Sequence, residues 1–436
     1  MKMGRDLISP TITQIRNDIK SGVKSGLEDF WRKIEENGTP LIEPIENDEN
    51  HKLVTFVVKA NDDTRNVVII TALANQDDVI SENVCEKIEN TNIFHKSFKV
   101  LNGTLTIYSI SKNNSLRFTR FYENIMINAK TLSPDPFNSK RFVQRYRREG
   151  RHFKIEYSVL EMPDGKTRSW SVLNESVPAG DLKQEDFYSN ILKMTRRIWI
   201  YTPPNYNTNG ERYHFLVIFD GKAFLDFTQP PIIFDNLIDK KKIPPVVAIF
   251  IHNYAGFQRG KDLNCYPLFA DFVAKELLPW AQENYYVTSE ANKSVLIGSS
   301  SGGLGAAFIG YKYPELFGKI LAQSGFFGWT PGNPWFQQVL KFYGKYYLRW
   351  WTPEDEKEEE WLVSQYLRSE KLPLQFYINV GSLENRTKYQ VGNFHDMLKK
   401  KGYEFCFKEY PGGHEYIAWR EHLPEGLIYL IGLTKN

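Results

Sequence analysis

The second half of the chain alternates short apolar runs with longer helix-forming stretches. The helical stretches lie notably at residues 268–283, 302–313 and 388–401. The apolar runs have the length of buried strands and lie at residues 215–219, 246–251, 294–297, 319–323, 375–380 and 404–410. This alternation predicts an α/β fold with a mostly parallel sheet and helices on both faces. In open sheets of this kind, ligands bind at the carboxyl ends of the strands.

The first half has a different pattern. Leu27, Phe30, Trp31 and Ile34 have helical spacing, so one helix is expected to lead this half. Short β-branched or aromatic runs follow, separated by Asn, Asp and Gly clusters, at residues 53–58, 66–70, 103–110 and 115–122. Runs of this kind predict a β-sandwich. We therefore expect an N-terminal β-sandwich domain with a leading helix over residues 1–180 and an α/β domain over residues 181–436.

Composition narrows the class of protein. Of 436 residues, 25% are charged and 42% are apolar, as in ordinary globular proteins. The net charge of +3 predicts no bulk affinity for nucleic acid or membranes. No apolar run approaches the roughly 18 residues of a membrane span. The three cysteines are far apart and form no metal-ligand cluster, so we expect a cytoplasmic protein without a metal cofactor. Oligomeric state stays open.

The strongest chemical signal is the segment Gly298-Ser299-Ser300-Ser301-Gly302-Gly303. It follows the apolar run at 294–297 and precedes a helix-forming stretch, which is the context that a GxSxG nucleophile elbow requires. The spacing places Ser300 at the centre of the motif. The pattern predicts an α/β-hydrolase domain with Ser300 as its nucleophile.

A serine nucleophile needs a base and an acid that orients the base. His414 follows the last predicted strand, in Pro411-Gly412-Gly413-His414, and is the candidate base. Glu384 lies just after the strand at 375–380 and is the candidate acid, with Asp396 a weaker alternative. Their order along the chain is that of α/β-hydrolases.

The developing oxyanion needs backbone N–H donors. One candidate is the amide of Ser301, next to the nucleophile. The other lies in the loop after the strand at 215–219, at Gly221 or Lys222, and the sequence leaves that choice open.

With these residues in place, the chain resembles the enterochelin esterase family, the siderophore trilactone hydrolases of the esterase-D type. The resemblance runs from about residue 27 to the end. It rests on an ordered set of motifs, including Gly38-Thr39-Pro40-Leu41-Ile42-Glu43, Asp135-Pro136-Phe137-Asn138, Trp199-Ile200-Tyr201-Thr202-Pro203-Pro204, Phe219-Asp220-Gly221, Arg259-Gly260-Lys261-Asp262-Leu263 and Gly412-Gly413-His414.

The resemblance implies a cytoplasmic serine esterase that cleaves a catecholate siderophore trilactone, usually as its ferric complex, with iron entering only as part of the substrate. It implies an N-terminal domain of the enterochelin esterase type and the triad Ser300, Glu384 and His414. Arg259 would face the anionic catecholate, because a guanidinium pairs with oxygen pairs and stacks on rings. The alternative for Arg259 is a salt bridge to Asp262 or to a helix end.

Two segments each have two possible interpretations. After Ser324-Gly325 the chain has Phe326-Phe327-Gly328-Trp329 and further aromatics up to Trp361, which form either a packed helical cap or a lid with Trp329 among the substrate contacts. The basic run at 140–154 is either an exposed interdomain segment or an electrostatic guide for an anionic ligand.

Two other functions compete with the siderophore esterase. The first keeps the triad but acts on another acyl, carbohydrate or peptide ester. The second is a non-catalytic binding protein on a hydrolase scaffold, which the intact Ser, acid and His spacing disfavours.

Overall fold

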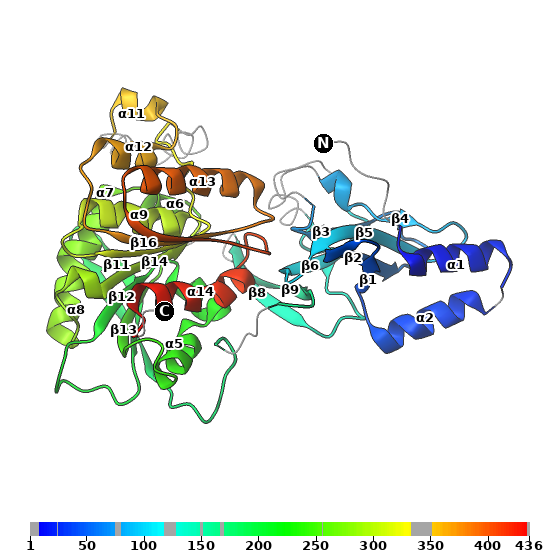
Figure 1. Cartoon of the computed structure of the whole chain (residues 1–436), viewed down its shortest axis with the longest axis horizontal. Helices are drawn as coiled ribbons and strands as arrows, with labels where there is room; N and C mark the ends of the chain where they lie inside the picture. Colours follow the sequence, from blue (N-terminus) through cyan, green and yellow to red (C-terminus); the bar gives the residue numbers. More distant parts are fainter. Residues whose placement is uncertain are drawn as a thin grey trace. The chain divides into compact units, whose positions relative to one another are not determined.

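The computed structural model describes residues 8–23, 25–74, 80–116, 128–148, 151–165, 170–254, 256–332 and 351–433. The chain folds into two compact units (Figure 1). The first unit comprises Met1–Thr167, Gly381–Asn385 and Tyr410–Ala418. The second comprises Arg168–Val380, Arg386–Glu409 and Trp419–Asn436.

The observed boundary corrects the prediction of residue 180. The first unit's main segment ends at Thr167. The carbonyls of Trp170 and Val172 already accept hydrogen bonds from Asn236 Nδ2 at 2.9 and 3.0 Å, which ties this segment to the second unit. Long-range contacts of this kind leave no local signature in the sequence. Residues 410–418 are joined to the first unit by the backbone contacts of Leu105 with Pro411 and Gly412.

The first unit contains α-helices, a short 3-10 helix and strands. The helical elements are α1 (Pro10–Lys20), α2 (Gly26–Asn37) and η1 (Ile80–Asn83). The strands are β1 (Leu41–Ile45), β2 (Asp48–Lys59), β3 (Val67–Thr71), β4 (Glu86–Lys87), β5 (Ile93–Leu101), β6 (Leu105–Lys112), β7 (Leu132–Ser133), β8 (Arg141–Arg148) and β9 (Arg151–Glu161).

Within the described part of this unit, the strands form two sheets. One has the order β1-β2-β5-β4 and the other the order β3-β6-β9-β8, with β7 paired to β6. The pairings within both sheets are antiparallel. One buried cluster joins Val54 and Phe56 of β2 to Val67 of β3 and Tyr108 and Ile110 of β6, so side chains of both sheets share a core.

The first unit differs from the sequence expectation in three places. A second helix, α1, precedes the predicted one, and Ile12 and Ile15 on it join Phe30 and Trp31 of α2 in a buried cluster. Strands β1, β4, β5 and β7 were not predicted. The basic run at 140–154 forms most of the antiparallel pair β8 and β9 rather than an interdomain segment. Of the predicted strand at 115–122, residues 117–122 lie outside the described ranges.

The second unit contains the strands that the alternating pattern predicted and, in addition, β10 and β11, which it did not predict. Its strands are β10 (Asp181–Ser189), β11 (Met194–Thr202), β12 (His214–Ile218), β13 (Val246–Ile251), β14 (Ser294–Ser299), β15 (Lys319–Gln323), β16 (Gln375–Gly381) and β17 (Glu404–Tyr410). Its helical elements are α4 (Gly221–Ala223), η2 (Phe224–Thr228), α5 (Pro230–Asp239), α6 (Phe257–Leu263), α7 (Pro267–Phe272), η3 (Val273–Leu277), α8 (Leu278–Asn284), η4 (Ala291–Lys293), α9 (Ser301–Lys312), α11 (Pro353–Lys357), α12 (Trp361–Arg368), α13 (Asn385–Lys400) and α14 (Tyr416–Ile431).

These strands form a sheet with the order β10-β11-β13-β12-β14-β15-β16-β17. The pairings from β13 through β12, β14 and β15 to β16 are parallel. Strands β10 and β11 add antiparallel pairings at one edge. Because parallel neighbours end at the same edge of a sheet, the loops after β12, β14 and β16 leave the sheet at a common edge.

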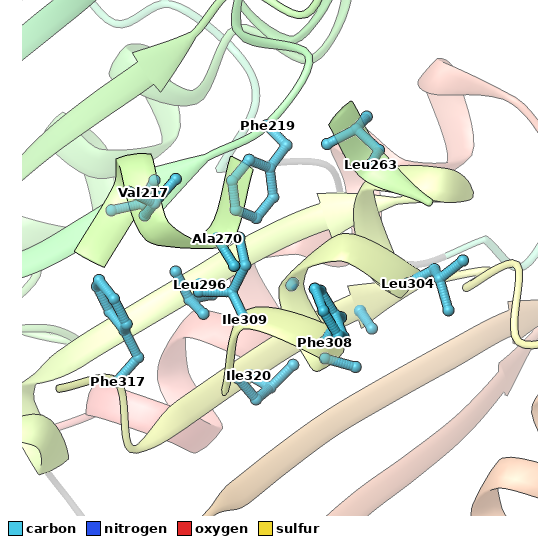
Figure 2. Close-up of a cluster of buried hydrophobic side chains, with 14 of the residues drawn as sticks. Val217, Phe219, Leu263, Ala270, Leu296, Leu304, Phe308, Ile309, Phe317 and Ile320 are labelled. Atoms are coloured by element: carbon cyan, nitrogen blue, oxygen red, sulfur yellow. The ribbon is translucent and has the colours of Figure 1, made fainter. Parts of the chain in front are cut away.

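Helices cover both faces of this sheet. A Cβ atom added to Gly310 of α9 would lie 2.5 Å from Ile320 Cδ1, and one added to Gly426 of α14 would lie 2.6 Å from Leu321 Cδ1. Ile320 and Leu321 are consecutive residues of β15, so they point to opposite faces. Figure 2 shows the α9 side, where Leu304, Phe308 and Ile309 pack among Leu296 and Ile320 of the strands.

Candidate active site

Ser300 lies in a sharp turn between β14 and α9. Its backbone has φ 57° and ψ −124°, a conformation that a residue with a side chain adopts at a cost. Hydrogen bonds hold the turn: Ser300 N donates to Gln323 O at 2.9 Å, and Ser300 O accepts from the amides of Gly303 and Phe326 at 3.0 Å. The strained turn, fixed on both sides, is the geometry of a nucleophile elbow.

The glycine at 298 is required by close approach of the backbone. A Cβ atom there would lie 2.3 Å from the carbonyl carbon and oxygen of Gly302. The strand before Ser300 and the helix after it therefore touch at these two positions. Any side chain at residue 298 would force the elbow apart.

His414 and Glu384 form a hydrogen-bonded pair within the first unit. His414 Nδ1 donates to Glu384 Oε2 at 2.5 Å. Glu384 is 2% exposed, and its Oε1 accepts from the Gly381 amide at 2.8 Å and from the Tyr410 hydroxyl at 3.2 Å. The buried carboxylate is thus held by three donors.

This pair determines which imidazole nitrogen is basic. A carboxylate only accepts hydrogen bonds, so the proton of neutral His414 lies on Nδ1 and the lone pair lies on Nε2. The His414 side chain is 18% exposed, whereas that of Glu384 is almost fully buried. An imidazole oriented in this way can act as a general base, with the carboxylate stabilising the imidazolium that forms.

The predicted oxyanion donors lie at the starts of two helical segments. Ser301 is the first residue of α9, and Gly221 is the first residue of α4. The first amides of a helix have no acceptor within it. A Cβ atom on Gly302 would lie 3.5 Å from Asp220 Oδ2, which places the loop before Gly221 against the elbow. The choice between the Gly221 and Lys222 amides stays open.

Gly221 is also the residue that this loop needs. A Cβ atom there would lie 2.7 Å from the carbonyl carbon of Phe250 and 2.8 Å from the amide nitrogen of Ile251. The loop therefore passes directly over strand β13. Lys222 is more exposed, and its ammonium pairs with Asp226 one turn further on.

Arg259 is held by Asp220 and not by Asp262. Its Nε and Nη2 atoms donate to the two Asp220 carboxylate oxygens at 2.7 and 2.8 Å. Its side chain is 30% exposed. The alternative of a salt bridge was therefore correct in kind, but the partner is the residue that precedes the oxyanion loop.

Asp262 has a different, fully buried partner. Arg196 donates from both Nη atoms to its two carboxylate oxygens at 2.7 Å. Asn253 Nδ2 also donates to Asp262, and Asn253 Oδ1 accepts from the Asp220 amide at 2.9 Å. A continuous set of hydrogen bonds thus links the buried ion pair to the loop that carries Gly221.

Trp329 is placed in the core. It is 1% exposed, and its ring lies edge-on to Trp351 and Trp361 at centroid distances of 5.5 and 6.0 Å. In this arrangement the indole packs against protein and presents no face to a substrate. This agrees with the packed helical cap and not with Trp329 as a substrate contact. Residues 333–350 of the aromatic segment lie outside the described ranges.

Three residues at the site were not singled out from the sequence: Asp220, Tyr410 and Glu415. Asp220 directly precedes Gly221, Tyr410 ends the strand before His414, and Glu415 directly follows His414. Adjacency to a candidate was the only available signal. The hydrogen-bond partners of these residues are distant in sequence, so no local motif predicts them.

Comparison with known proteins identifies the family of this chain. The family model described as "Putative esterase" matches residues 189–430, more than half of the chain. The chain belongs to this esterase family. It is therefore a carboxylic ester hydrolase.

Relatives extend the similarity over both units. The esterase is 24% identical to an iron(III) enterobactin esterase of Dickeya dadantii, with 94% of each chain covered. It is also 24% identical to an iron(III) salmochelin esterase of Escherichia coli, with 97% of this chain and 98% of the relative covered. The predicted resemblance to the enterochelin esterases is confirmed.

Solved structures show the same fold. The ferric enterobactin esterase of Salmonella typhimurium matches with a TM-score of 0.71 at 21% identity, covering 92% of this chain and 98% of that one. An enterobactin esterase of Shigella flexneri, crystallised in the presence of enterobactin, matches with a TM-score of 0.70 at 21% identity, covering 92% and 97%.

Membrane-spanning helices and metal-ligand clusters were both sought among the described residues. None of the helices in those ranges is both long and apolar enough to cross a membrane. Nor do the same ranges contain a group of three or more His, Cys, Asp or Glu residues arranged to hold a metal ion.

Proposed function

We propose that this esterase hydrolyses the ester bonds of a catecholate siderophore trilactone, of the enterobactin or bacillibactin type, and so releases iron. Relatives that match nearly the whole chain are named for esters of this class. The observation that carries the chemistry is the hydrogen bond from His414 to the buried Glu384, which makes Nε2 the basic nitrogen.

We propose Ser300 as the nucleophile served by this pair. Its support is the strained backbone of the elbow and the order of the three residues along the chain. Further support comes from the sheet, because Ser300 follows β14 and Glu384 follows β16, and both strands run parallel to β15 between them.

In the proposed acylation step, His414 Nε2 takes the Ser300 hydroxyl proton as the oxygen attacks the lactone carbonyl. The tetrahedral oxyanion accepts hydrogen bonds from the Ser301 amide and from the Gly221 or Lys222 amide. The imidazolium then protonates the leaving serine or threonine oxygen of the substrate, the ring opens, and an acyl-enzyme remains.

In the proposed deacylation step, His414 removes a proton from water, which attacks the acyl-enzyme. Collapse of the second tetrahedral intermediate releases the linear product and restores the Ser300 hydroxyl. A linear ligand holds iron less tightly than the trilactone. Iron is therefore part of the substrate in this proposal, and the ferric complex is the form expected to be cleaved.

Recognition of the catecholate is assigned to Arg259. Asp220 binds Nε and Nη2 of this residue, and the flat face of a guanidinium can stack on a catechol ring. We also propose that the first unit is the N-terminal β-sandwich domain of enterochelin esterases. A cytoplasmic location is proposed from the cysteines, which are all free thiols.

Two assays test the proposal. The first follows p-nitrophenyl acetate hydrolysis by the wild-type chain, by S300A and by S299A, whose changed hydroxyl lies one residue away. Activity should be lost only in S300A. The second incubates the wild-type chain with ferric and iron-free enterobactin or bacillibactin and separates the products by chromatography. Linear trimer, dimer or monomer should appear.

The outcomes separate the competing functions. Cleavage of the acetate ester without cleavage of any catecholate lactone would leave an esterase for another ester. Absence of both activities, in a folded protein, would favour the binding protein. A stoichiometric metal ion found by mass spectrometry in the purified chain would contradict a reaction without a resident metal.

A further inference from the structure

The loop that carries His414 is held by strand β6. Leu105 N donates to Pro411 O at 3.1 Å, and Leu105 forms a parallel bridge with Gly412. A Cβ atom on Gly412 would lie 3.1 Å from Leu105 O, so the two backbones are in close contact. All of these residues belong to the first unit. The loop is therefore tied to a strand some three hundred residues earlier in the sequence.

Glu415 makes the second attachment of this loop. The side chain is buried, and Glu415 is 7% exposed. Thr106 Oγ1 donates to its carboxyl group, with both oxygens at 3.0 Å, and the Ile107 amide donates to Oε2 at 3.1 Å. A carboxyl group on the residue next to the candidate base is thus anchored to the two β6 residues that follow Leu105.

Burial also determines the charge of this carboxyl group. Desolvation raises the pKa of Glu415 to about 8, the hydrogen bonds from Ile107 and Thr106 lower it, and the Glu384 carboxylate raises it further. Strand β9 pairs with β6, and its Glu161 lies opposite Leu105. The Glu161 carboxylate forms an ion pair with Lys140, with Nζ and Oε2 2.5 Å apart. At pH 7, which lies below this pKa, Glu415 is largely protonated and adds little negative charge beside His414.

A neutral Glu415 suits both tasks of the loop. It can accept from β6 without placing a second negative charge near Glu384. Ionisation would add a second negative charge near Glu384, the repulsion that already raises the pKa of Glu415. It would also leave a buried charge that two neutral donors serve poorly.

We propose that Glu415 is a positioning residue, which clamps the His414 loop to Thr106 and Ile107 of β6 and thereby sets the imidazole against Glu384. The inference rests on the proposed function only in taking His414 as the base. It assigns to strand β6 a part in catalysis that does not involve contact with substrate.

Kinetics of three variants test the clamp. E415A removes the carboxyl group and should lower kcat by about a hundredfold with KM within about twofold, since small misplacements of catalytic groups have effects of this size. E415Q keeps the shape and a neutral acceptor, and should retain kcat at pH 7. T106V removes the donor hydroxyl at nearly constant shape, and its kcat should lie between those of E415A and E415Q. E409Q is the matched control, because Glu409 is a partly exposed glutamate of β17 paired with Lys388.

The pH profile separates positioning from general destabilisation. Wild-type kcat should decline as pH rises through about 8, where Glu415 ionises, and the E415Q profile should lack that decline. Rates are normalised to the folded fraction. Wild-type kcat in folded E415A would overturn the proposal, and so would an E415Q variant as impaired as E415A.

A substrate-independent measurement distinguishes this proposal from the proposed function. The proton shared by His414 Nδ1 and Glu384 gives a strongly deshielded NMR signal, which should persist in E415Q and be lost or shifted in E415A. If no ester is hydrolysed but the signal behaves in this way, the clamp stands and the function fails. An unchanged signal in E415A would refute the clamp.

Discussion

Replacing Glu384 with glutamine tests the orientation of the catalytic base. The substitution keeps the shape of the side chain and removes its charge. The new side chain can still accept from the Gly381 amide, which lies 2.8 Å from Oε1. Its NH₂ group then faces His414 Nδ1, at the position of the oxygen that accepts at 2.5 Å. Two donors cannot pair, so the imidazole must move its proton to Nε2 or turn away.

The magnitude follows from losing that tautomer. In serine hydrolases, changing the triad acid to its amide lowers kcat by about 10³–10⁴, equivalent to about 4–5 kcal/mol of barrier. Glu384 is 2% exposed and bonded to three donors, so no water can readily replace it. We expect a loss in this range. KM should change by less than about threefold, because the proposed role of Glu384 involves no contact with substrate.

The assay measures kcat and KM for p-nitrophenyl acetate between pH 6 and 9, with E409Q as the matched control. Circular dichroism and the thermal midpoint establish that the variant is folded. A kcat within tenfold of wild type in the folded variant would refute the assignment of Glu384. Asp396, the weaker candidate acid in the sequence, would then be tested by the same substitution.

Three further predictions concern stability. G298A should lower the free energy of unfolding by about 3 kcal/mol, measured by urea denaturation, because the new methyl group would meet the Gly302 backbone at 2.3 Å; unchanged stability would contradict the elbow geometry. R196M should cost about 3–5 kcal/mol in the same measurement by leaving Asp262 buried without its partner, and a neutral effect would contradict the burial of the pair. Between pH 4.5 and about 8, Glu415 is ionised in the unfolded chain and protonated in the folded one, so stability should fall with rising pH by up to about 1 kcal/mol per unit. E415Q should remove that slope, and equal slopes in both proteins would contradict the raised pKa.

The sequence predicted the second unit well because the central strands of its sheet are buried on both faces. Such strands read as short continuous apolar runs. The runs at 246–251, 319–323 and 404–410 coincide with β13, β15 and β17 at both ends. The nucleophile elbow was predicted equally well, because the strand, the glycine spacing and the helix are local features of the sequence.

The sequence was less informative where long-range contacts decide the structure. Strand β8 and strand β9 carry a run of basic residues, and nothing in that run shows that the two strands pair. The partner of Arg259 could not be read from its motif, because Asp220 lies 39 residues away and Asp262 is taken by Arg196. The attachment of Glu415 to Thr106 spans 309 residues and has no local pattern at all.

The pairing of Ser300 with His414 is the claim on which the proposed chemistry depends, and it remains a prediction from chain order, sheet register and the elbow. The most direct test is to quench the wild-type chain during turnover of a catecholate trilactone and to measure its intact mass, followed by peptide mapping. We expect a covalent adduct that adds the full mass of the trilactone with no water gained or lost, located on Ser300 and absent from S300A. Turnover with no adduct on Ser300, or an adduct on another residue, would contradict the pairing.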